Sequence, residues 1–372
     1  MKIVVLGGTG DMGSAAVEDL IKFTDVGQVT IAARNTAAAE KLALSLGDPR
    51  IVVQKFDAAS PGDLIRVMQG HDVAAGALGP FYRFEKPLVR AALAAGVDYV
   101  SICDDHDAVQ EVLPFDQAAR DKGRRIITGL GWTPGITSIF ARKGFGELEE
   151  TESIGVYWAG SVGDSEGLAV ILHTLHIFTG RVTSFQQGRE VAVKAGTGKA
   201  IVQFPEPLGK VQVFHLGHPE PVTLPRYLPG LREVTLKGGL AESYLHILAK
   251  TMVALGLTST DSRKQKLGWL MKKMLPLFPT NKKRALSGAK VEITGWRGGK
   301  NMRISYATVD QMRRLTGIPL SIGAGMLAKG IISRYGVFGP EAEGAIGADT
   351  FLQELARRDI KVERREEELS TL

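Results

Sequence analysis

A glycine-rich turn directly after the first apolar run limits most strongly what this chain can fold into. Residues 3–6 read IVVL, and Gly7 to Gly13 read GGTGDMG. Residues 14–23 then carry apolar side chains at helical spacing. The order strand, glycine turn, helix is typical of the first unit of a doubly wound α/β domain.

Three of these glycines, Gly8, Gly10 and Gly13, fit the pattern G-x-G-x-x-G. Glycines at this spacing allow a tight turn, let backbone N–H groups approach a pyrophosphate, and permit close contact between helix and strand. The helix N-terminus adds partial positive charge. The pattern therefore predicts a dinucleotide-binding turn.

The end of the next strand indicates which dinucleotide is bound. The strand 28–33 ends about 20 residues after the last glycine, where a ribose-reading residue is expected. Arg34 and Asn35 stand there, with no acidic residue to accept hydrogen bonds from a ribose 2′-hydroxyl. Arg34 could pair with a 2′-phosphate, which favours NADP over NAD. The alternative is that Arg34 stacks on the adenine of either cofactor.

Length and composition indicate a soluble protein of two domains. The chain has 372 residues, 44% of them hydrophobic and 23% charged. Its single cysteine, Cys103, excludes an internal disulfide and a multi-cysteine zinc site, which fits a reducing compartment. No signal peptide or membrane-length apolar run is visible. We therefore expect a cytoplasmic protein.

The first 130 residues alternate between strand and helix patterns, which predicts a parallel sheet with helices on both faces. This Rossmann domain is expected at 1–130. Its further strands are predicted at 51–54, 72–75, 99–102 and 125–128, and its further helices at 61–69, 87–95 and 108–122.

Beyond the glycine- and proline-rich loop 129–135 the pattern changes to that of a mostly antiparallel sheet. A second, α+β domain is expected at 131–315, and helices at 316–372 are expected to return and pack on the Rossmann domain. Residues 363–368 are predicted to be a solvated, frayed terminus. Strands are predicted at 153–158, 189–194, 200–204, 210–215, 232–236 and 290–296, and helices at 136–143, 166–179, 241–255, 262–275, 318–335 and 350–359.

Several segments resemble the saccharopine dehydrogenase family. They cover most of the chain, strongly in the first 145 and last 60 residues and weakly between. They read GGTGDMG, AARN, Phe56-Asp57, GPFY from Gly79, ALAAGVDYV, the loop from Gly129 to Gly135, TGIPLSIGAGML, and PEAEGAI followed by FLQELARRDI.

The resemblance implies NAD(P)-dependent oxidation of a carbon–nitrogen bond in an amino-acid-derived substrate. By the same resemblance, Gly8, Gly10, Asp11 and Met12 hold the pyrophosphate, Arg34 and Asn35 meet the adenosine ribose, Asp57 meets the adenine, and Gly79, Pro80 and Phe81 lie on the nicotinamide side. One segment departs from the family. Many relatives read YVDLTGE where this chain reads YVSICDD, so an acid is lost at Ser101 and another appears at Asp104.

The loop after the fifth strand could supply an acid or base. Loss of a hydride from an amine carbon requires a neutral nitrogen, which a base helps to maintain. Asp104, Asp105 and His106 lie in this loop. The alternative for Asp105, and the favoured interpretation of Asp107, is capping of a helix that begins near residue 108. Cys103 is interpreted as a packed small residue.

A substrate carboxylate would be bound by an arginine or by N–H groups and hydroxyls at a helix start. Candidates are Tyr82, Arg83, Trp132, Thr137 and Arg226, although each arginine is more often a surface residue. His173 and His176 lie three residues apart on a predicted helix, but no third ligand is suggested nearby, so no metal site is expected.

The positive net charge of +6 is local. Nine basic residues and no acidic one lie between Ser262 and Lys290, and subtracting nine from +6 leaves −3. Nucleic-acid binding is therefore not expected. Lys266, Lys272 and Lys273 are predicted to point away from an apolar helix face formed by Leu267, Leu270, Met271, Met274 and Leu275, with Trp269 on the charged side. The favoured interpretation is a helix docked on its own domain or on a homodimer partner. The alternative is a helix on an anionic membrane or over an anionic substrate.

The sequence thus predicts an NADP-preferring, homodimeric oxidoreductase with an amino-acid-like substrate. One alternative is an enzyme like lysine 6-dehydrogenase, deaminating with NAD. Another is a membrane-recruited cofactor-binding protein that turns over no amino acid, since a fold does not fix a function.

Overall fold

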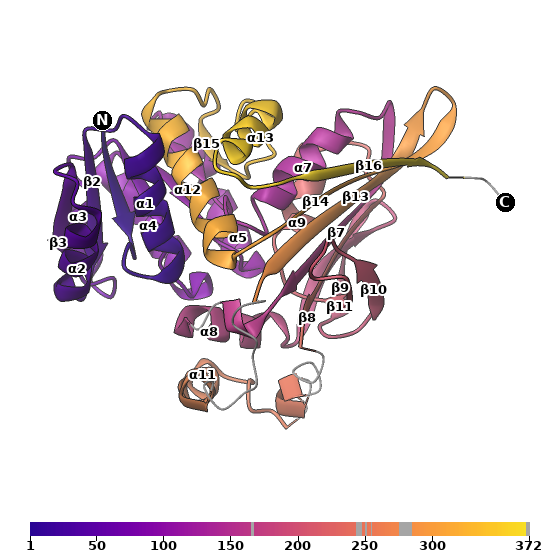
Figure 1. Ribbon diagram of the computed structural model, residues 1–372, viewed down its shortest axis with the longest axis horizontal. Helices are drawn as coiled ribbons and strands as arrows, with labels where there is room; N and C mark the ends of the chain where they lie inside the picture. The colour runs from indigo at the N-terminus through magenta and orange to yellow at the C-terminus, as the bar shows by residue number, and fades with distance from the viewer. Residues whose placement is uncertain (165–166, 243–247, 250, 254, 275–284, 370–372) are drawn as a thin grey trace. The chain divides into compact units, whose positions relative to one another are not determined.

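A computed structural model describes residues 1–164, 167–242, 248–249, 251–253, 255–274 and 285–369 (Figure 1). The chain forms two compact units. The first comprises Met1–Ile136 and Arg313–Gly347, and the second comprises Thr137–Met312 and Ala348–Leu372. The first unit extends a few residues past the expected boundary at 130.

The described residues of the first unit form a sheet of seven parallel strands in the order β15-β6-β5-β4-β1-β2-β3. From β1 the strands are added toward one edge of the sheet up to β3, and from β4 they are added toward the other edge. Ligands of such sheets bind at this switch point, at the carboxyl ends of β1 and β4. The Rossmann-type sheet is confirmed. Its strands are β1 Lys2–Leu6, β2 Gln28–Ala33, β3 Ile51–Lys55, β4 Val73–Gly76, β5 Asp98–Ser101, β6 Arg125–Ile127 and β15 Gly336–Phe338.

Helices of this unit follow the strands in turn. The apolar residues of β1, β4 and β5 and of α3 and α4 share one core cluster. Helix α12 lies beside α1 (Figure 1), so close that a Cβ on Gly317 would come within 2.5 Å of the Met12 carbonyl oxygen. The helices are α1 Asp11–Phe23, α2 Thr36–Leu46, α3 Pro61–Met68, α4 Phe81–Ala95, α5 His106–Val112, α6 Asp116–Asp121 and α12 Met312–Ala328.

Two helices of the first unit differ from the sequence-based prediction. Helix α4 begins at Phe81 rather than at Pro87, which lies inside it. The single helix predicted at 108–122 is broken into α5, a 3₁₀ turn at Leu113–Phe115, and α6. Pro114 lies at the break, and because it has no N–H group it cannot continue the α-helical hydrogen bonding.

The described residues of the second unit form a nine-stranded mixed sheet along the path β10-β11-β12-β7-β13-β14-β16, in which β8 also pairs with β12 and β9 pairs with β8. Among the described strand pairs of this second sheet, only β12 and β7 are parallel. The expected mostly antiparallel sheet is therefore confirmed. Its strands are β7 Glu150–Gly160, β8 Arg181–Gln186, β9 Arg189–Lys194, β10 Ala200–Gln203, β11 Lys210–His215, β12 Glu233–Leu240, β13 Ser287–Arg297, β14 Lys300–Asp310 and β16 Glu363–Glu368. Its helices are α7 Ile136–Phe145, which starts at the boundary, α8 Leu168–Ile177, α9 Glu220–Tyr227, α11 Asp261–Met274 and α13 Ala348–Ala356.

The prediction of a frayed terminus at 363–368 is wrong. These residues form β16, which runs along the edge of β14 (Figure 1). Cross-strand ion pairs join Arg303 to Glu367 at 2.7 Å and Lys300 to Glu368 at 2.8 Å. The strand is exposed throughout, so it carries none of the apolar alternation that identifies a half-buried strand.

The prediction that residues 316–372 as a whole pack on the Rossmann domain is also wrong. Residues up to Gly347 do so, and β15 pairs with β6 at the edge of the parallel sheet. From Ala348 on, the chain belongs to the second unit. The helix predicted to run to residue 335 ends at Ala328, before Gly330, whose φ of +68° is unfavourable for other residues in a helix.

The predicted helix 241–255 and the basic residues 282–284 lie partly or wholly outside the described residues. Within the part of the chain that the structure describes, no helix combines the length and the apolar character needed to cross a membrane.

Candidate functional site in the first unit

The glycine turn between β1 and α1 is as tight as its sequence predicts. A Cβ on Gly13 would lie 2.3 Å from the Gly7 carbonyl oxygen, and one on Gly7 would lie 2.7 Å from the Ala77 carbonyl oxygen. Gly7 also has φ +83°, a backbone conformation that favours glycine. Gly7 is not one of the three glycines of the G-x-G-x-x-G pattern. Gly8 and Gly10 are less crowded. The sequence signal that Gly7 is also required was its position directly before Gly8.

The start of α1 suits an anion. Gly10 is its N-cap residue and has no side chain to bond the first N–H groups of the helix. Asp11 is exposed and Met12 half-buried, so the turn lies at the surface. This arrangement fits the pyrophosphate of a dinucleotide, and the absence of a Cβ at Gly13 lets the start of α1 lie against the Gly7 carbonyl group.

The end of β2 presents Arg34 to solvent. Among the described residues it has no hydrogen-bond or ion-pair partner, which leaves its guanidinium available to a phosphate. Asn35 caps α2, accepting a hydrogen bond from the N–H of Ala38 at 3.4 Å. Its predicted contact with the ribose would therefore compete with a structural role.

Asp57 follows β3 on the same edge of the sheet and is exposed. Its Oδ1 accepts a hydrogen bond from the N–H of Ala59 at 3.0 Å. The predicted adenine contact of Asp57 stays a prediction.

The turn after β4 leads through a cis Gly79-Pro80 bond into α4. Phe81 is buried, Tyr82 half-buried and Arg83 exposed, with the Arg83 guanidinium 5.6 Å from the Phe84 ring centroid. The predicted nicotinamide contacts of Gly79, Pro80 and Phe81, and the substrate contacts of Tyr82 and Arg83, stay predictions.

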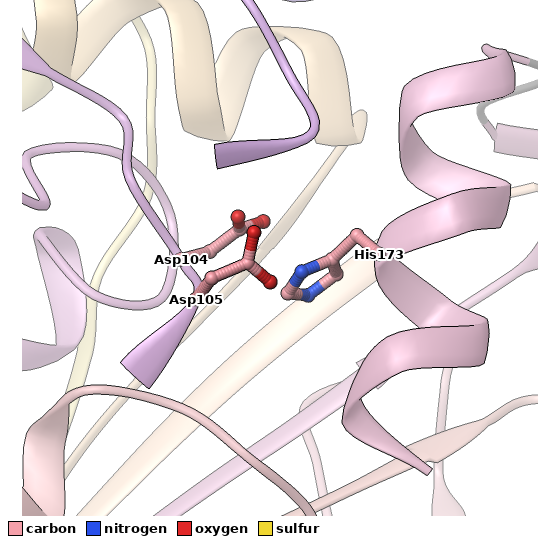
Figure 2. Close-up of side chains that lie close together, drawn as sticks. All are labelled: Asp104, Asp105 and His173. Carbon is pink, nitrogen blue, oxygen red and sulfur yellow. The ribbon is translucent and has the colours of Figure 1, made fainter. Parts of the chain in front are cut away.

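The loop between β5 and α5 carries the candidate acids and base. Figure 2 shows the carboxylates of Asp104 and Asp105 next to each other on this loop, with oxygens within 4.8 Å. Asp104 and His106 are half-buried, and Asp105 is fully buried. The predicted catalytic roles of Asp104 and His106 stay predictions.

Asp105 has a structural role that neither interpretation of the sequence included. It is the N-cap residue of α5, but its side chain does not cap that helix. Its Oδ2 instead accepts a hydrogen bond from the N–H of Tyr82 at 2.8 Å, in the first turn of α4. Asp107 is not the cap, because α5 already begins at His106. Its Oδ1 accepts a hydrogen bond from the N–H of Ala108 at 2.9 Å.

A buried acid on α4, Glu85, was missed by the sequence analysis. Its Oε1 accepts hydrogen bonds from Ser101 Oγ at 2.6 Å and Thr128 Oγ1 at 3.0 Å, and its Oε2 accepts one from Tyr99 OH at 2.9 Å. Burial raises the pKa of Glu85 from 4.5 to about 7 in spite of these three donors. The sequence signal for this buried acid was that Glu85 is the only acidic residue among the positions of α4 that the apolar spacing places on its buried face.

Cys103 lies in the same region and is buried. Burial, together with the nearby carboxylates, holds the pKa of the Cys103 thiol well above its usual value. A thiol that resists ionisation is a poor nucleophile, which agrees with the interpretation of Cys103 as a packed small residue.

Trp132 lies in the loop 129–135, whose residues are buried, and its side chain is 7% exposed. Gly135 closes the loop with φ +125°, where a Cβ would come within 2.1 Å of the Gly131 carbonyl oxygen. The predicted role of Trp132 in substrate binding stays a prediction.

Two predicted substrate contacts belong to the second unit. Thr137 is fully buried and donates a hydrogen bond from Oγ1 to Glu220 Oε1 at 2.8 Å. The predicted contact of Thr137 with a substrate carboxylate stays a prediction, and it would compete with this hydrogen bond to Glu220. Arg226 is exposed on α9, its guanidinium 5.9 Å from the Tyr227 ring centroid.

The histidines of α8 have separate surroundings within the second unit. Figure 2 shows His173 projecting from α8, and its ring packs edge-on against His218 at a centroid distance of 5.2 Å. His176 Nδ1 lies 2.9 Å from Lys264 Nζ. The two rings therefore contact different partners, although they are three residues apart.

The comparison with protein families is decisive for the first unit. Residues 3–127 match the family model of the saccharopine dehydrogenase NADP-binding domain. The N-terminal domain belongs to the saccharopine dehydrogenase NADP-binding family. The resemblance seen in the sequence is confirmed, and the chain contains a binding domain for a nicotinamide dinucleotide.

The relatives of this chain differ in how much of it they match. Carboxyaminopropylagmatine dehydrogenase of Synechocystis is 22% identical over 97% of this chain and 96% of its own length. A putative trans-acting enoyl reductase of Mycobacterium tuberculosis is 27% identical over 41% of this chain and 39% of its own length. The structure of yeast saccharopine dehydrogenase (L-Glu forming) superposes with a TM-score of 0.73 at 16% identity, covering 98% of this chain and 99% of that one. The last likeness shows the shared fold.

Proposed function

We propose that this protein is an NADP-preferring oxidoreductase that transfers a hydride to or from a carbon bearing an amine or imine, in an amino-acid-derived substrate. The observation that carries the cofactor preference is Arg34, exposed at the end of β2 where an NAD-specific domain would place an acid. A guanidinium binds a phosphate through charge-assisted hydrogen bonds.

The relatives support the carbon–nitrogen chemistry. Two relatives that match nearly the whole chain are named for saccharopine and for carboxyaminopropylagmatine, both of which are amines. The enoyl reductases match only 41% of the chain. This length is little more than that of the cofactor domain. We therefore favour an amine over a carbon–carbon double bond as the reacting group.

In the proposed mechanism the residues of the first unit bind and orient. The Gly7 to Gly13 turn and the start of α1 would hold the pyrophosphate, and Arg34 the 2′-phosphate. When bound, the nicotinamide ring accepts or donates the hydride. Asp104 takes the proton from the substrate ammonium, so that the nitrogen lone pair can assist hydride loss. Asp105 positions this loop through its hydrogen bond to Tyr82.

The test is cofactor reduction at 340 nm with NADP and with NAD across a panel of substrates. The panel holds lysine, saccharopine, carboxyaminopropylagmatine, other amino acids and polyamines, and the reverse reaction uses matching pairs of aldehyde and amine. Turnover of one amine with NADP preferred supports the proposal. Preferred use of NAD with lysine would favour the deaminating alternative.

An enoyl thioester is included as a competing substrate class. Oxidation of NADPH by the thioester, without turnover of any amine, would contradict the proposed carbon–nitrogen chemistry. The Asp104→Asn variant is measured beside the wild type. The proposal requires it to lose turnover while keeping NADP affinity, because a proton acceptor near the substrate contributes about 10²- to 10⁴-fold.

A further inference from the structure

Helix α11 packs one of its faces on α8 within the second unit. The close approach is made at Gly268, where a Cβ would meet Leu172 Cδ2 at 2.8 Å. Lys264 lies one turn earlier on this face, is 8% exposed, and contacts His176 through Nζ. This face is therefore covered by the chain itself, which agrees with the expected docking on its own domain.

The opposite face of α11 carries apolar and cationic side chains together. Lys266, Trp269, Leu270 and Lys273 are spaced three and four residues apart and so share one side of the helix. Trp269 is 55% exposed and Leu270 54% exposed. The prediction that Leu270 and Met274 belong to the buried face is wrong, since both are exposed, whereas the placement of Trp269 on the charged side is confirmed.

Exposed apolar side chains are concentrated around this helix. Among the described residues, eleven large hydrophobic side chains are classed as exposed, and five of them lie within residues 255–274. Single exposed apolar residues are common, but a group of them indicates an interaction surface. The five are Leu255, Leu257, Trp269, Leu270 and Met274.

The charge of the same region points to the partner. Helix α11 carries five basic residues, Arg263, Lys264, Lys266, Lys272 and Lys273, and one acid, Asp261, at its first position, which gives 5 − 1 = +4 of the +6 of the whole chain. Lys272 Nζ lies 5.8 Å from the Trp269 ring centroid, so cation and aromatic ring occupy one patch. An anionic bilayer attracts lysines through its headgroups and exposed apolar side chains through the boundary below the headgroups, and this patch offers both.

We infer that the outward face of α11, formed by Lys266, Trp269, Leu270 and Lys273, binds the surface of an anionic lipid bilayer. The lysines pair with the headgroups and the tryptophan and leucine enter the boundary between headgroups and acyl chains. The helix lies on the membrane and does not cross it, in keeping with its mixed polar and apolar character. This surface is formed by residues of the second unit alone, and the inference does not depend on the proposed reaction.

The experiment is sedimentation of the full chain with phosphatidylcholine vesicles that contain or lack phosphatidylglycerol. We expect binding only with phosphatidylglycerol, weakened by salt. The double variant Lys266→Glu/Lys273→Glu should bind at least about 30-fold more weakly, because each lysine near an anionic surface contributes about fivefold. Trp269→Ser should also weaken binding.

Matched controls separate this patch from general charge and apolar effects. Lys199→Glu/Lys210→Glu makes the same charge change on exposed lysines of the same unit, and Ile201→Ser removes an apolar side chain that is 64% exposed. These variants should bind as the wild type does. Unchanged NADP affinity and thermal midpoint show that each variant is folded.

A second measurement needs no variant. Of the four tryptophans only Trp269 is exposed, because Trp132 and Trp158 are 7% and 5% exposed and Trp296 is half-buried. A blue shift of the emission and quenching by a lipid-borne quencher therefore report mainly on the insertion of Trp269. Absence of vesicle binding, or equal loss in the control variants, would overturn the inference. So would a finding that the α11 variants change only the oligomeric state, which would assign the patch to a second copy of the chain.

Discussion

The Asp105 carboxylate accepts a hydrogen bond of 2.8 Å from the backbone N–H of Tyr82. Asp105 is fully buried at the end of the loop after β5, and Tyr82 lies in the first turn of α4. The bond joins the loops that follow two neighbouring strands of the parallel sheet. It also supplies an acceptor to the start of α4, whose first N–H groups have no partner within the helix.

Replacing Asp105 should therefore lower the stability of the protein more than it lowers the turnover rate. Asp105→Ala is expected to lower the free energy of unfolding by about 1–2 kcal/mol, the usual cost of losing a capping side chain. Asp105→Asn keeps an oxygen acceptor and should retain most of both stability and turnover. Urea denaturation and the 340 nm assay measure the two effects. If Asp105→Asn abolished turnover while leaving stability unchanged, Asp105 would be the base in place of Asp104.

Glu85 predicts a pH dependence of stability. Its pKa is raised from 4.5 to about 7 in the folded protein, so the folded state binds a proton that the unfolded state has released in this pH range. The contribution of Glu85 is thus greatest below pH 4.5 and declines as pH rises to about 7, by about 3 kcal/mol in all. Glu85→Gln should remove this decline. Urea denaturation of both proteins at pH 5 and pH 8 measures it, and parallel changes in the two would contradict the assignment.

Gly13 offers a direct test of the cofactor turn. The Cβ of Gly13→Ala would lie 2.3 Å from the Gly7 carbonyl oxygen, so the turn must open. We expect NADP affinity, measured by calorimetry, to fall at least about tenfold, or ~1.4 kcal/mol. The control is Gly62→Ala on α3, whose Cβ meets nothing within 4 Å and which should bind NADP normally. Wild-type affinity in Gly13→Ala would place the pyrophosphate elsewhere.

Thr137 distinguishes packing from substrate binding in the second unit. Thr137→Val removes the hydroxyl that donates to buried Glu220, and we expect a loss of about 1–3 kcal/mol in the free energy of unfolding. Thr223→Val is the control, because Thr223 is buried but its hydroxyl has no hydrogen-bond partner among the described residues. A raised KM with unchanged stability in Thr137→Val would support the role expected from the sequence.

The first unit was largely predictable because its signals are local. A parallel strand buried on both faces reads as a short apolar run, and the turn after β1 requires glycine at fixed positions. The start of α4 at Phe81 was not predictable in this way. It depends on Asp105, which lies more than twenty residues away in the sequence.

The second unit was harder to predict. The Gly298-Gly299 pair, with φ of +59° and +72°, forms the turn between β13 and β14, and Gly-Gly between two apolar runs is a hairpin signal. That signal was available and was not used. The pairing of β16 with β14 depends instead on complementary charges brought together by the fold, so no local pattern marks it.

The buried network of the candidate site shows a different limit. Ser101 was noticed only as the loss of an acid, and the structure shows that its hydroxyl bonds Glu85, an acid that α4 contributes from another part of the chain. The role of such a buried polar residue becomes clear only when the residue to which it hydrogen-bonds is known. Exposed residues such as Arg34 can be interpreted from position alone, because strand ends in a parallel sheet are fixed by the strand pattern.

The most direct test of the account is the ratio of the NADP and NAD dissociation constants, measured by calorimetry at one salt concentration for the wild type and Arg34→Asp. Arg34 is predicted to bind the 2′-phosphate, and a hydrogen bond to a charged group contributes about 1.5–3 kcal/mol. The variant should therefore bind NADP at least about tenfold more weakly while NAD binding is kept or improved. Lys41→Asp, an equal charge change at an exposed residue of α2, should leave the ratio as it is. An unchanged ratio in Arg34→Asp would contradict the account.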